Sequence, residues 1–317
     1  MLGDTIMMTS KLLVFNLDFL VVAGGGGGIY STNQGGGAGG LRTSYGSTSG
    51  GGASAENSIE VTSGNSFTVT VGAGGPHINA SNYSSPSKGG NSVFGTITSL
   101  AGGIGIAGND SNGVPWKNGG SGVGGSYGGN PGSQGTAGQG FAGGSLSGAP
   151  NYKVGGSGGA GGVGQDGTGG SPNSGRSGDG GDGLAVNILS VNNALVASVG
   201  EIPGLSSDVF YAGGGGGGSD SYRGRSAGSG GIGGGGSGGY NSNGTSGIPN
   251  TGGGGGGGSN RPSSMNGGSG GSGVVILRYP NIVSPTLSGL TESPGSPFIE
   301  GNDKITVITA GSGTITF

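Results

Sequence analysis

The sequence predicts an all-β, otherwise irregular fold in which β-strands alternate with polyglycine II helices and α-helix is almost absent. Glycine accounts for 93 of the 317 residues, and apolar, β-branched segments alternate with the glycine tracts. No segment shows an amphipathic period of 3.6 residues over a useful length. Interior glycine also destabilises an α-helix by about 0.5–1 kcal/mol per residue relative to alanine. A disordered low-complexity chain is the alternative for this composition, and the strand segments argue against it.

Runs of apolar and β-branched residues predict the strands. The run 59–71 contains Ser63-Gly64-Asn65 and predicts a hairpin, as do two final runs separated by residues 310–313. The segment 184–199 holds two further runs around Asn192-Asn193. In chain order, the expected strands lie within residues 12–22, 59–71, 93–100, 184–199, 209–212, 274–279, 305–309 and 314–317.

The glycine tracts have a period of three residues. Glycine occupies every third position from 155 to 170, and shorter runs follow the same rule at 119–128, 129–138, 230–239 and 267–273. A period of three is that of an extended three-fold helix, whose N–H and C=O groups must bond laterally to neighbours. Close lateral approach needs positions without a Cβ atom, so we expect all-glycine runs such as 213–218 and 252–258 to lie inside a bundle. The period breaks too often, and the 13 prolines are too few, for collagen.

Composition and charge exclude several classes of function. The chain has no cysteine and one histidine, His77, which excludes disulfides, thiolate metal sites and two-histidine metal sites. A net charge of −3 with 11 basic residues does not suit a nucleic-acid partner. Repeated GxGxxG patterns open no helix in a βαβ unit, and a lone loop histidine does not make a catalytic triad. We therefore expect no cofactor and no enzymatic activity.

The N-terminal apolar segment does not suit a membrane span. Residues 12–23 are too few, and Asn16 and Asp18 interrupt them, so we expect a strand and no membrane insertion. Because Met1 is present, we expect no cleaved signal peptide, with an uncleaved or atypical export signal as the alternative.

An ordered set of motifs resembles the glycine-rich module of phage tail-fibre and tail-tip adhesins, which also occurs in surface proteins of marine microbes and viruses. The resemblance implies a β-strand-framed sandwich of polyglycine II helices, with host-receptor binding through loops at one end of the sandwich. The motifs, from residue 19 to 280, are FLVVAGGGGG (19–28), GGGAGGLR (35–42), SFTVTVGAGG (66–75), GGNSVFG (89–95), FYAGGGGGG (210–218), NTGGGGGGG (250–258) and GGSGGSGVVILRYP (267–280).

The chain divides into four parts on this basis. Residues 1–18 are an N-terminal strand or attachment segment, 19–280 the glycine-rich sandwich, 281–297 a Pro-rich linker and 298–317 a C-terminal hairpin. In tandem versions of the module, a strand like GSGTITF precedes the LVVAGGGG strand, so the order here resembles a circular permutation. The C-terminal hairpin then either closes on its own chain or completes a neighbouring subunit by strand addition.

Aromatic and cationic residues that interrupt the glycine tracts are the candidates for receptor contact. Each is expected in a turn at the end of a three-fold helix, and tyrosine, tryptophan and arginine are common binding anchors. The alternative is that they frame the sandwich by packing. The candidates are His77, Tyr83, Trp116, Lys117, Tyr152, Lys153, Tyr222, Arg223, Arg225 and Tyr240.

Three aspartates are weak candidates for a calcium site. Asp166 lies in GGVGQDGT, which matches most of the calcium β-roll repeat, and Asp179 and Asp182 lie in DGGDG. Calcium β-rolls need tandem copies, and Thr168 stands where a large apolar residue is required. We therefore expect these aspartates to serve in polar turns, with no bound metal.

Two functions of different classes remain. The first is a non-enzymatic tail-fibre or tail-tip adhesin of a virion, whose partners are a host cell-surface glycan or outer-membrane protein and other tail proteins or copies of itself. The second is an extracellular structural subunit that self-assembles into filaments or a surface layer, through C-terminal strand exchange. Ice binding is a third alternative, and the broken triplet period argues against the flat face it requires.

Overall fold

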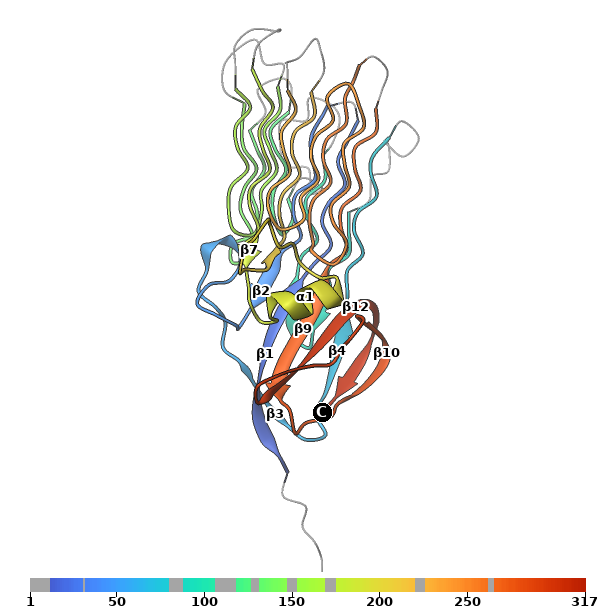
Figure 1. The fold of residues 1–317 in the computed structure, drawn as a ribbon. Coiled ribbons are helices and arrows are strands. Elements are labelled where there is room, and N and C mark those ends of the chain that lie inside the picture. The colour runs from blue at the N-terminus through green and yellow to red at the C-terminus, as the bar shows by residue number, and fades with distance from the viewer. Residues whose placement is uncertain are drawn as a thin grey trace, which may run out of the picture.

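The computed structural model describes residues 12–30, 32–79, 88–105, 118–126, 131–146, 153–168, 175–219, 226–261 and 265–317. It has two parts, a strand module that contains the C-terminus and a bundle of long extended segments that leaves one end of that module (Figure 1). We call these extended segments rods. Nearly all regular structure is β, which confirms the predicted fold class.

The strand module is a mainly antiparallel sheet of ten strands. Its main path runs in the order β2-β1-β9-β12-β4-β5-β6, while β3 pairs with β1, and β10 and β11 pair with β12. A separate pair, β7 and β8, and one α-helix cover part of the sheet (Figure 1). The elements are β1 (Val14–Val22), β2 (Leu41–Thr43), η1 (Gly50–Gly52), β3 (Ile59–Thr62), β4 (Ser66–Thr70), β5 (Ser92–Phe94), β6 (Ile97–Ser99), β7 (Leu184–Ala185), α1 (Val191–Ala197), β8 (Phe210–Tyr211), β9 (Val274–Pro280), β10 (Thr286–Glu292), β11 (Phe298–Glu300) and β12 (Asp303–Thr316).

Alternation along β1 creates two apolar cores, because successive side chains of a strand point to opposite faces. Phe19 and Val21 join an aromatic core with Phe94 on one face of the sheet. Leu20 and Val22 join the core on the other face, which α1 and the β7–β8 pair cover. The module is therefore held together by ordinary side-chain packing.

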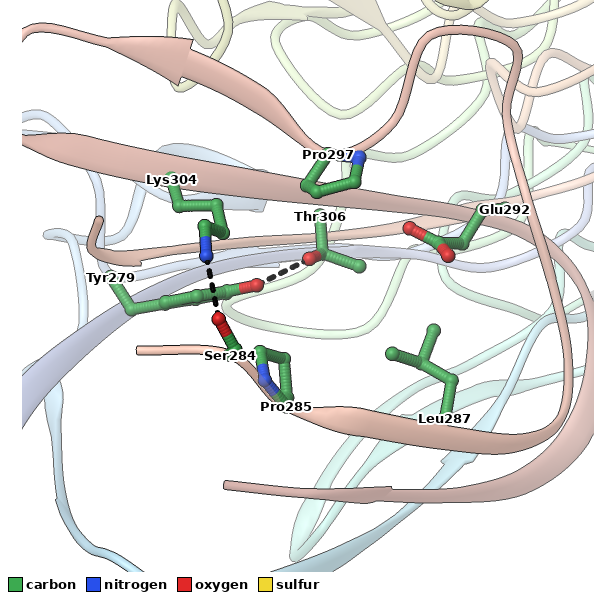
Figure 2. A pocket seen from close by; sticks show the side chains of 8 residues that line it. All are labelled: Tyr279, Ser284, Pro285, Leu287, Glu292, Pro297, Lys304 and Thr306. Carbon is green, nitrogen blue, oxygen red and sulfur yellow. Dashed lines mark hydrogen bonds between the residues drawn. The ribbon is translucent and has the colours of Figure 1, made fainter. Parts of the chain in front are cut away.

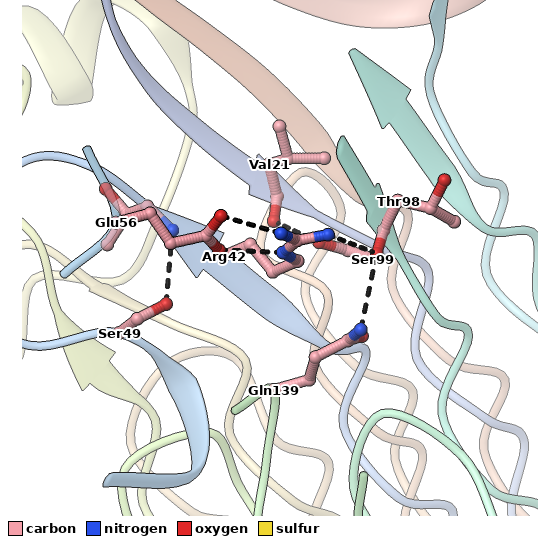
Figure 3. Close-up of polar contacts among 8 residues, drawn as sticks. Val21, Arg42, Ser49, Glu56, Thr98, Ser99 and Gln139 are labelled. Carbon is pink, nitrogen blue, oxygen red and sulfur yellow. Dashed lines mark hydrogen bonds and ion pairs between the residues drawn. The ribbon is translucent and has the colours of Figure 1, made fainter. Parts of the chain in front are cut away.

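Side chains nearly close the sheet between its two end strands, β2 and β6 (Figure 3). The backbone carbonyl of Gln139 accepts a hydrogen bond from the Leu41 N–H at 3.0 Å on the β2 side. Its side-chain amide donates to the Thr98 carbonyl at 3.3 Å and accepts from the Leu100 N–H at 2.8 Å on the β6 side. Arg42 reaches the same Thr98 carbonyl at 3.5 Å and forms an ion pair with Glu56. Gln139 thus joins two strands that do not pair directly.

The rods are three-fold helices, as the direction of their backbone hydrogen bonds shows. In the rod 213–218, successive N–H groups donate to three neighbouring rods in turn, and every third N–H group returns to the same neighbour. The N···O distances are 2.7–3.0 Å. A period of three residues is the one predicted from the glycine spacing. The acceptors, in order from Gly213 to Gly218, are the carbonyl groups of Gly233, Gly181, Gly36, Gly236, Gly178 and Asn33.

Three other rods surround the same rod from its remaining sides. The carbonyl groups of residues 213–217 accept N–H groups from Gly254, Gly231, Ser157, Gly257 and Gly228 in turn. The rod 213–218 therefore has six neighbours and lies inside the bundle, as predicted for an all-glycine run. A Cβ atom at Gly215 would lie 2.1 Å from the carbonyl oxygen of Gly255, so only glycine permits this packing.

Residues 303–316 form a single strand, so the predicted hairpin turn at residues 310–313 is wrong, and the C-terminal segment instead forms a hairpin between β11 and β12. The strand β12 continues through Gly311, whose φ of +106° is open to glycine, and pairs with β9, β4, β10 and β11 of its own chain. The expected Pro-rich linker contains β10, which lies along β12. The partners of β12 in this structure are therefore strands of its own chain, and completion of a neighbouring subunit stays a prediction.

Two other local predictions also differ from the structure. The strands on either side of Gly64 form as predicted, but β3 pairs with β1 and β4 with β12, so they make no hairpin. The segment 184–199 contains β7 and the helix α1 in place of two strand runs. The helix buries Ala194 and Ala197 and ends at Ser198 in the left-handed conformation, a common helix C-terminus. One apolar stripe over seven residues is too short a signal for helical periodicity.

Candidate functional site

The rods place a defined set of residues at the end of the bundle farthest from the strands. The rod 24–29 continues directly from β1, and the rod 213–219 continues from β8, so residues 29 and 219 lie at that end (Figure 1). Isolated bridges join Ile29 to Ile78 and Ser219 to Tyr240 at the same level. We call the level of these four residues the distal end.

A small apolar cluster fixes part of the distal end. Ile29, Ile78 and Ile104 come from three different rods, are almost fully buried, and pack together with Tyr30 beside them. Backbone bonding alone allows rods to slide along one another, because each glycine resembles the next. Three branched side chains packed in one place oppose such sliding.

Two described candidates, His77 and Tyr240, lie at or next to the distal end. Tyr240 is 42% exposed and precedes Asn241, which turns the chain with a φ of +48°. The backbone N–H of His77 donates to the hydroxyl of Ser269 at 3.2 Å, and its ring lies 3.3 Å from the side-chain amide of Asn79. Both are positioned by neighbouring rods.

Lys153 does not fit the expectation of an exposed contact. Its side chain is 3% exposed, and burial lowers the pKa of its ammonium group. A Cβ atom at Gly175 would lie 2.7 Å from its Nζ, so the lysine lies against the chain around residue 175. Its position favours the alternative reading, in which the residue frames the bundle by packing.

Seven candidates lie outside the described residues. The residues that flank two of their segments, 147–152 and 220–225, lie near the distal end. Leu146 and Ser219 precede these two segments, and Lys153 and Ser226 follow them. All four residues lie near the distal end, where bridges or packing join them to neighbouring rods. The seven are Tyr83, Trp116, Lys117, Tyr152, Tyr222, Arg223 and Arg225.

The three aspartates considered for calcium join rods to one another. Asp166 accepts the Ser145 N–H at 2.6 Å, and Asp182 accepts the Ile232 N–H at 3.0 Å. Asp179 accepts the backbone N–H of residue 229 at 2.6 Å and pairs with Arg176. Within the described residues, no group of three or more His, Cys, Asp or Glu side chains could hold a metal ion. The contacts are those of polar turns.

Sequence reasoning missed a hollow at the other end of the molecule. It lies in the strand module and is lined by side chains of β9, β10, β12 and their connections (Figure 2). Its charged residues, Glu292 and Lys304, are separated in the sequence and follow no recognisable motif. Only the path of the chain after β9 brings them together.

Comparison with known proteins gives one match. A family model described as a glycine-rich domain matches residues 4–280 of the chain. No curated protein and no solved structure matches it. Within the described part of the chain, no helix has the length and apolar character needed to cross a membrane.

Proposed function

The chain belongs to the glycine-rich domain family, and from this premise we propose that it is a non-enzymatic phage tail-fibre or tail-tip adhesin. In this proposal, segments carried at the distal end bind a host cell-surface glycan or outer-membrane protein. The strand module is the end attached to the virion, where other tail proteins or further copies of the chain are its partners.

The attachment of the segment 220–225 is the observation that carries the proposal. The segment contains Tyr222, Arg223 and Arg225, and it joins the central rod 213–219 to the rod that starts at Ser226. Ser226 accepts a backbone hydrogen bond from Ser177 at 3.1 Å, and the Ser177 hydroxyl donates to Gly218 at 2.8 Å. The described residues on both sides of the segment are thus fixed by neighbouring rods, and binding residues are often carried by loops on such a rigid scaffold.

The rods themselves limit where function can evolve. Inside the bundle a side chain would meet neighbouring backbone, as the contact of 2.1 Å at Gly215 illustrates. At the distal end, by contrast, the described chain reversal at Tyr240 and Asn241 carries larger side chains, and Tyr240 is 42% exposed. This division supports recognition by connecting segments and gives the rods a structural role.

The alternative function, a self-assembling filament subunit, gains no support from the C-terminal strand. In the structure of the single chain, β12 pairs with β9, β4 and β10 of that chain, and exchange would have to replace these contacts by the same ones between subunits. The exposed apolar residues Leu12, Leu13 and Val14 at the start of β1 are instead suited to a contact at the attachment end.

Binding to a panel of bacterial cells by the fluorescently labelled protein tests the proposal. The variant Tyr222→Ala/Arg223→Ala/Arg225→Ala should lose at least tenfold in affinity for the cells that the wild-type protein binds, with no change in thermal unfolding. A control with three exposed changes on the strand module, Glu60→Ala, Thr286→Ala and Thr291→Ala, should bind normally. Equal binding by both variants would refute the proposed contact segment, and unlimited polymers in negative-stain micrographs would favour the filament.

A further inference from the structure

The hollow in the strand module has a volume of about 130 Å³. Two connections of the chain border it. Residues 281–285 connect β9 to β10, and residues 293–297 connect β10 to β11. The lining residues are Tyr279, Ser284, Pro285, Leu287, Glu292, Pro297, Lys304 and Thr306 (Figure 2).

Two opposite charges face this hollow without neutralising each other. Lys304 and Glu292 lie on opposite sides of the Tyr279–Thr306 pair (Figure 2). Neither Lys304 nor Glu292 belongs to any of the ion pairs found among the described residues. A molecule between them that carries both charges would satisfy both.

Each charged group is oriented and keeps hydrogen-bonding capacity. The Lys304 ammonium donates to the Val283 carbonyl at 2.6 Å and to the Ser284 hydroxyl at 3.1 Å, which uses two of its three donors. One carboxylate oxygen of Glu292 accepts the Ser296 hydroxyl at 2.7 Å, and a carboxylate has about four acceptor positions. The two groups are thus held in place by the chain while remaining able to bind a ligand.

The floor of the hollow is polar and neutral, and its walls are apolar. The Tyr279 hydroxyl lies 2.5 Å from the Thr306 hydroxyl. Burial raises the pKa of Tyr279 to about 12, and the Glu292 carboxylate also raises it, so the phenol stays protonated at neutral pH. Pro285, Leu287 and Pro297 supply the apolar walls. A ligand with charged ends and a short apolar body matches this distribution.

We infer that the hollow binds a small zwitterion, an amino acid with its carboxylate toward Lys304 and its ammonium toward Glu292. The volume supports this size, because a cavity of about 150 Å³ holds one benzene molecule. A neutral hexose is larger than benzene and would leave both charges unpaired. The inference is independent of the proposed receptor binding, since the hollow lies in the strand module and the receptor segments join the distal end.

Isothermal titration calorimetry with β-alanine and γ-aminobutyrate at neutral pH tests the inference. The wild-type protein should bind at least one of them, and Glu292→Gln should weaken that binding at least tenfold, or about 1.4 kcal/mol. Acetate should bind weakly and equally to the wild type and to Glu292→Gln, because its only charged group faces Lys304. Glu60→Gln, an exposed change on β3, is the matched control and should leave zwitterion binding unchanged.

Three results would each overturn the inference. The first is that no zwitterion gives binding heat at millimolar concentration, and the second is that a neutral hexose binds more tightly than the zwitterions. The third is that Glu292→Gln binds the zwitterion as tightly as the wild type. Lys304→Gln should abolish acetate binding as well, and the Glu292 variant alone decides the matter if Lys304→Gln fails to fold. Cell binding by Glu292→Gln should stay normal, which separates this site from the receptor segments.

Discussion

The rod bundle and the strand module are held together by different parts of the amino acids. In the rod 213–218, backbone N–H and C=O groups bond to six neighbouring rods, and no side chain exists to pack. In the strand module, Phe19, Phe94 and Ile276 are fully buried in two side-chain cores. The comparison explains how a chain with only 29% apolar residues can fold, since a backbone core needs few apolar side chains.

The difference also predicts opposite sensitivities to mutation. Interior glycines such as Gly215 have no space for an added carbon, because a neighbouring carbonyl oxygen lies only 2.1 Å from the position of the missing Cβ. The module tolerates small changes of volume, because side chains can adjust their rotamers. Substitutions that add or remove a single carbon, or remove a single side-chain amide, should therefore change the unfolding free energy differently in the two regions.

The largest effect is expected for Gly215→Ala. The new methyl group would lie 2.1 Å from the Gly255 carbonyl oxygen, and neither rod can yield without breaking hydrogen bonds to its other neighbours. We expect a loss of at least about 3 kcal/mol of unfolding free energy, the upper part of the usual range for overpacking. Urea denaturation measures it.

Gly162→Ala is the matched control for this substitution. A Cβ atom there would meet its nearest neighbour, the Asp182 backbone, at an ordinary distance of 3.5 Å. Its unfolding free energy should change by less than about 1 kcal/mol. Similar losses for the two variants would show that the rods are not packed through their backbones.

The next effect concerns the seam between β2 and β6. Gln139→Ala removes the amide that bonds the Thr98 carbonyl and the Leu100 N–H, and it leaves both backbone groups without that partner. We expect a loss of about 2 kcal/mol in chemical denaturation, the cost of leaving two partly buried polar groups without their hydrogen bonds. Gln165→Ala changes an exposed glutamine and should cost almost nothing, so equal losses would contradict the role of the seam.

A pH-dependent effect is expected where α1 meets the strands. Burial acts to raise the pKa of Glu300, but hydrogen bonds from Ser190 and Asn193 and the charge of Arg278 outweigh it and lower that pKa. The stabilisation is therefore complete above the ordinary carboxyl pKa of 4.5 and is lost as the pH falls through the lowered pKa of the folded state.

Thermal unfolding of the wild type and of Glu300→Gln at neutral and acidic pH checks this prediction. At neutral pH the variant should be less stable by about 1.5 kcal/mol, because charged hydrogen bonds are lost. The difference should shrink as the pH falls below 4.5. A difference that stays constant with pH would contradict the lowered pKa.

The smallest effect is expected for Ile276→Val in the strand module. It removes one carbon from a fully buried side chain on β9 and should cost about 1 kcal/mol in the same denaturation assay. The comparison with Gly215→Ala is direct, since one carbon is removed in one region and one is added in the other. A larger loss for Ile276→Val than for Gly215→Ala would reverse the comparison.

Sequence reasoning predicted those features whose signal is local and repeated. The triplet spacing predicted the three-fold rods, and the β-branched runs predicted β1, β4 and β9. Strand partners were less accessible, because the turn at Gly64 looks like a hairpin although its two strands pair elsewhere. The helix α1 is too short for a periodic signal, and its formation depends on tertiary packing against the sheet.

The candidate site residues also differ in whether the local sequence could predict their positions. The interruptions of glycine tracts at His77 and Tyr240 marked rod ends, whereas the burial of Lys153 depends on rods distant in the sequence. The hollow between Glu292 and Lys304 was not predictable, because the chain path from β9 to β12 assembles it. Local composition therefore indicates where rods end, and only the fold indicates which side chains meet.

Hydrogen–deuterium exchange of the native protein tests the backbone core most directly. If lateral hydrogen bonds hold the bundle, the amides of residues 213–218 and 254–258 should exchange as slowly as those of β9 and β12, although no side chains cover them. Protection in both regions should disappear together in urea if they unfold as one unit. Exchange of the glycine amides at the rate of an unstructured peptide, with β9 and β12 still protected, would contradict the account.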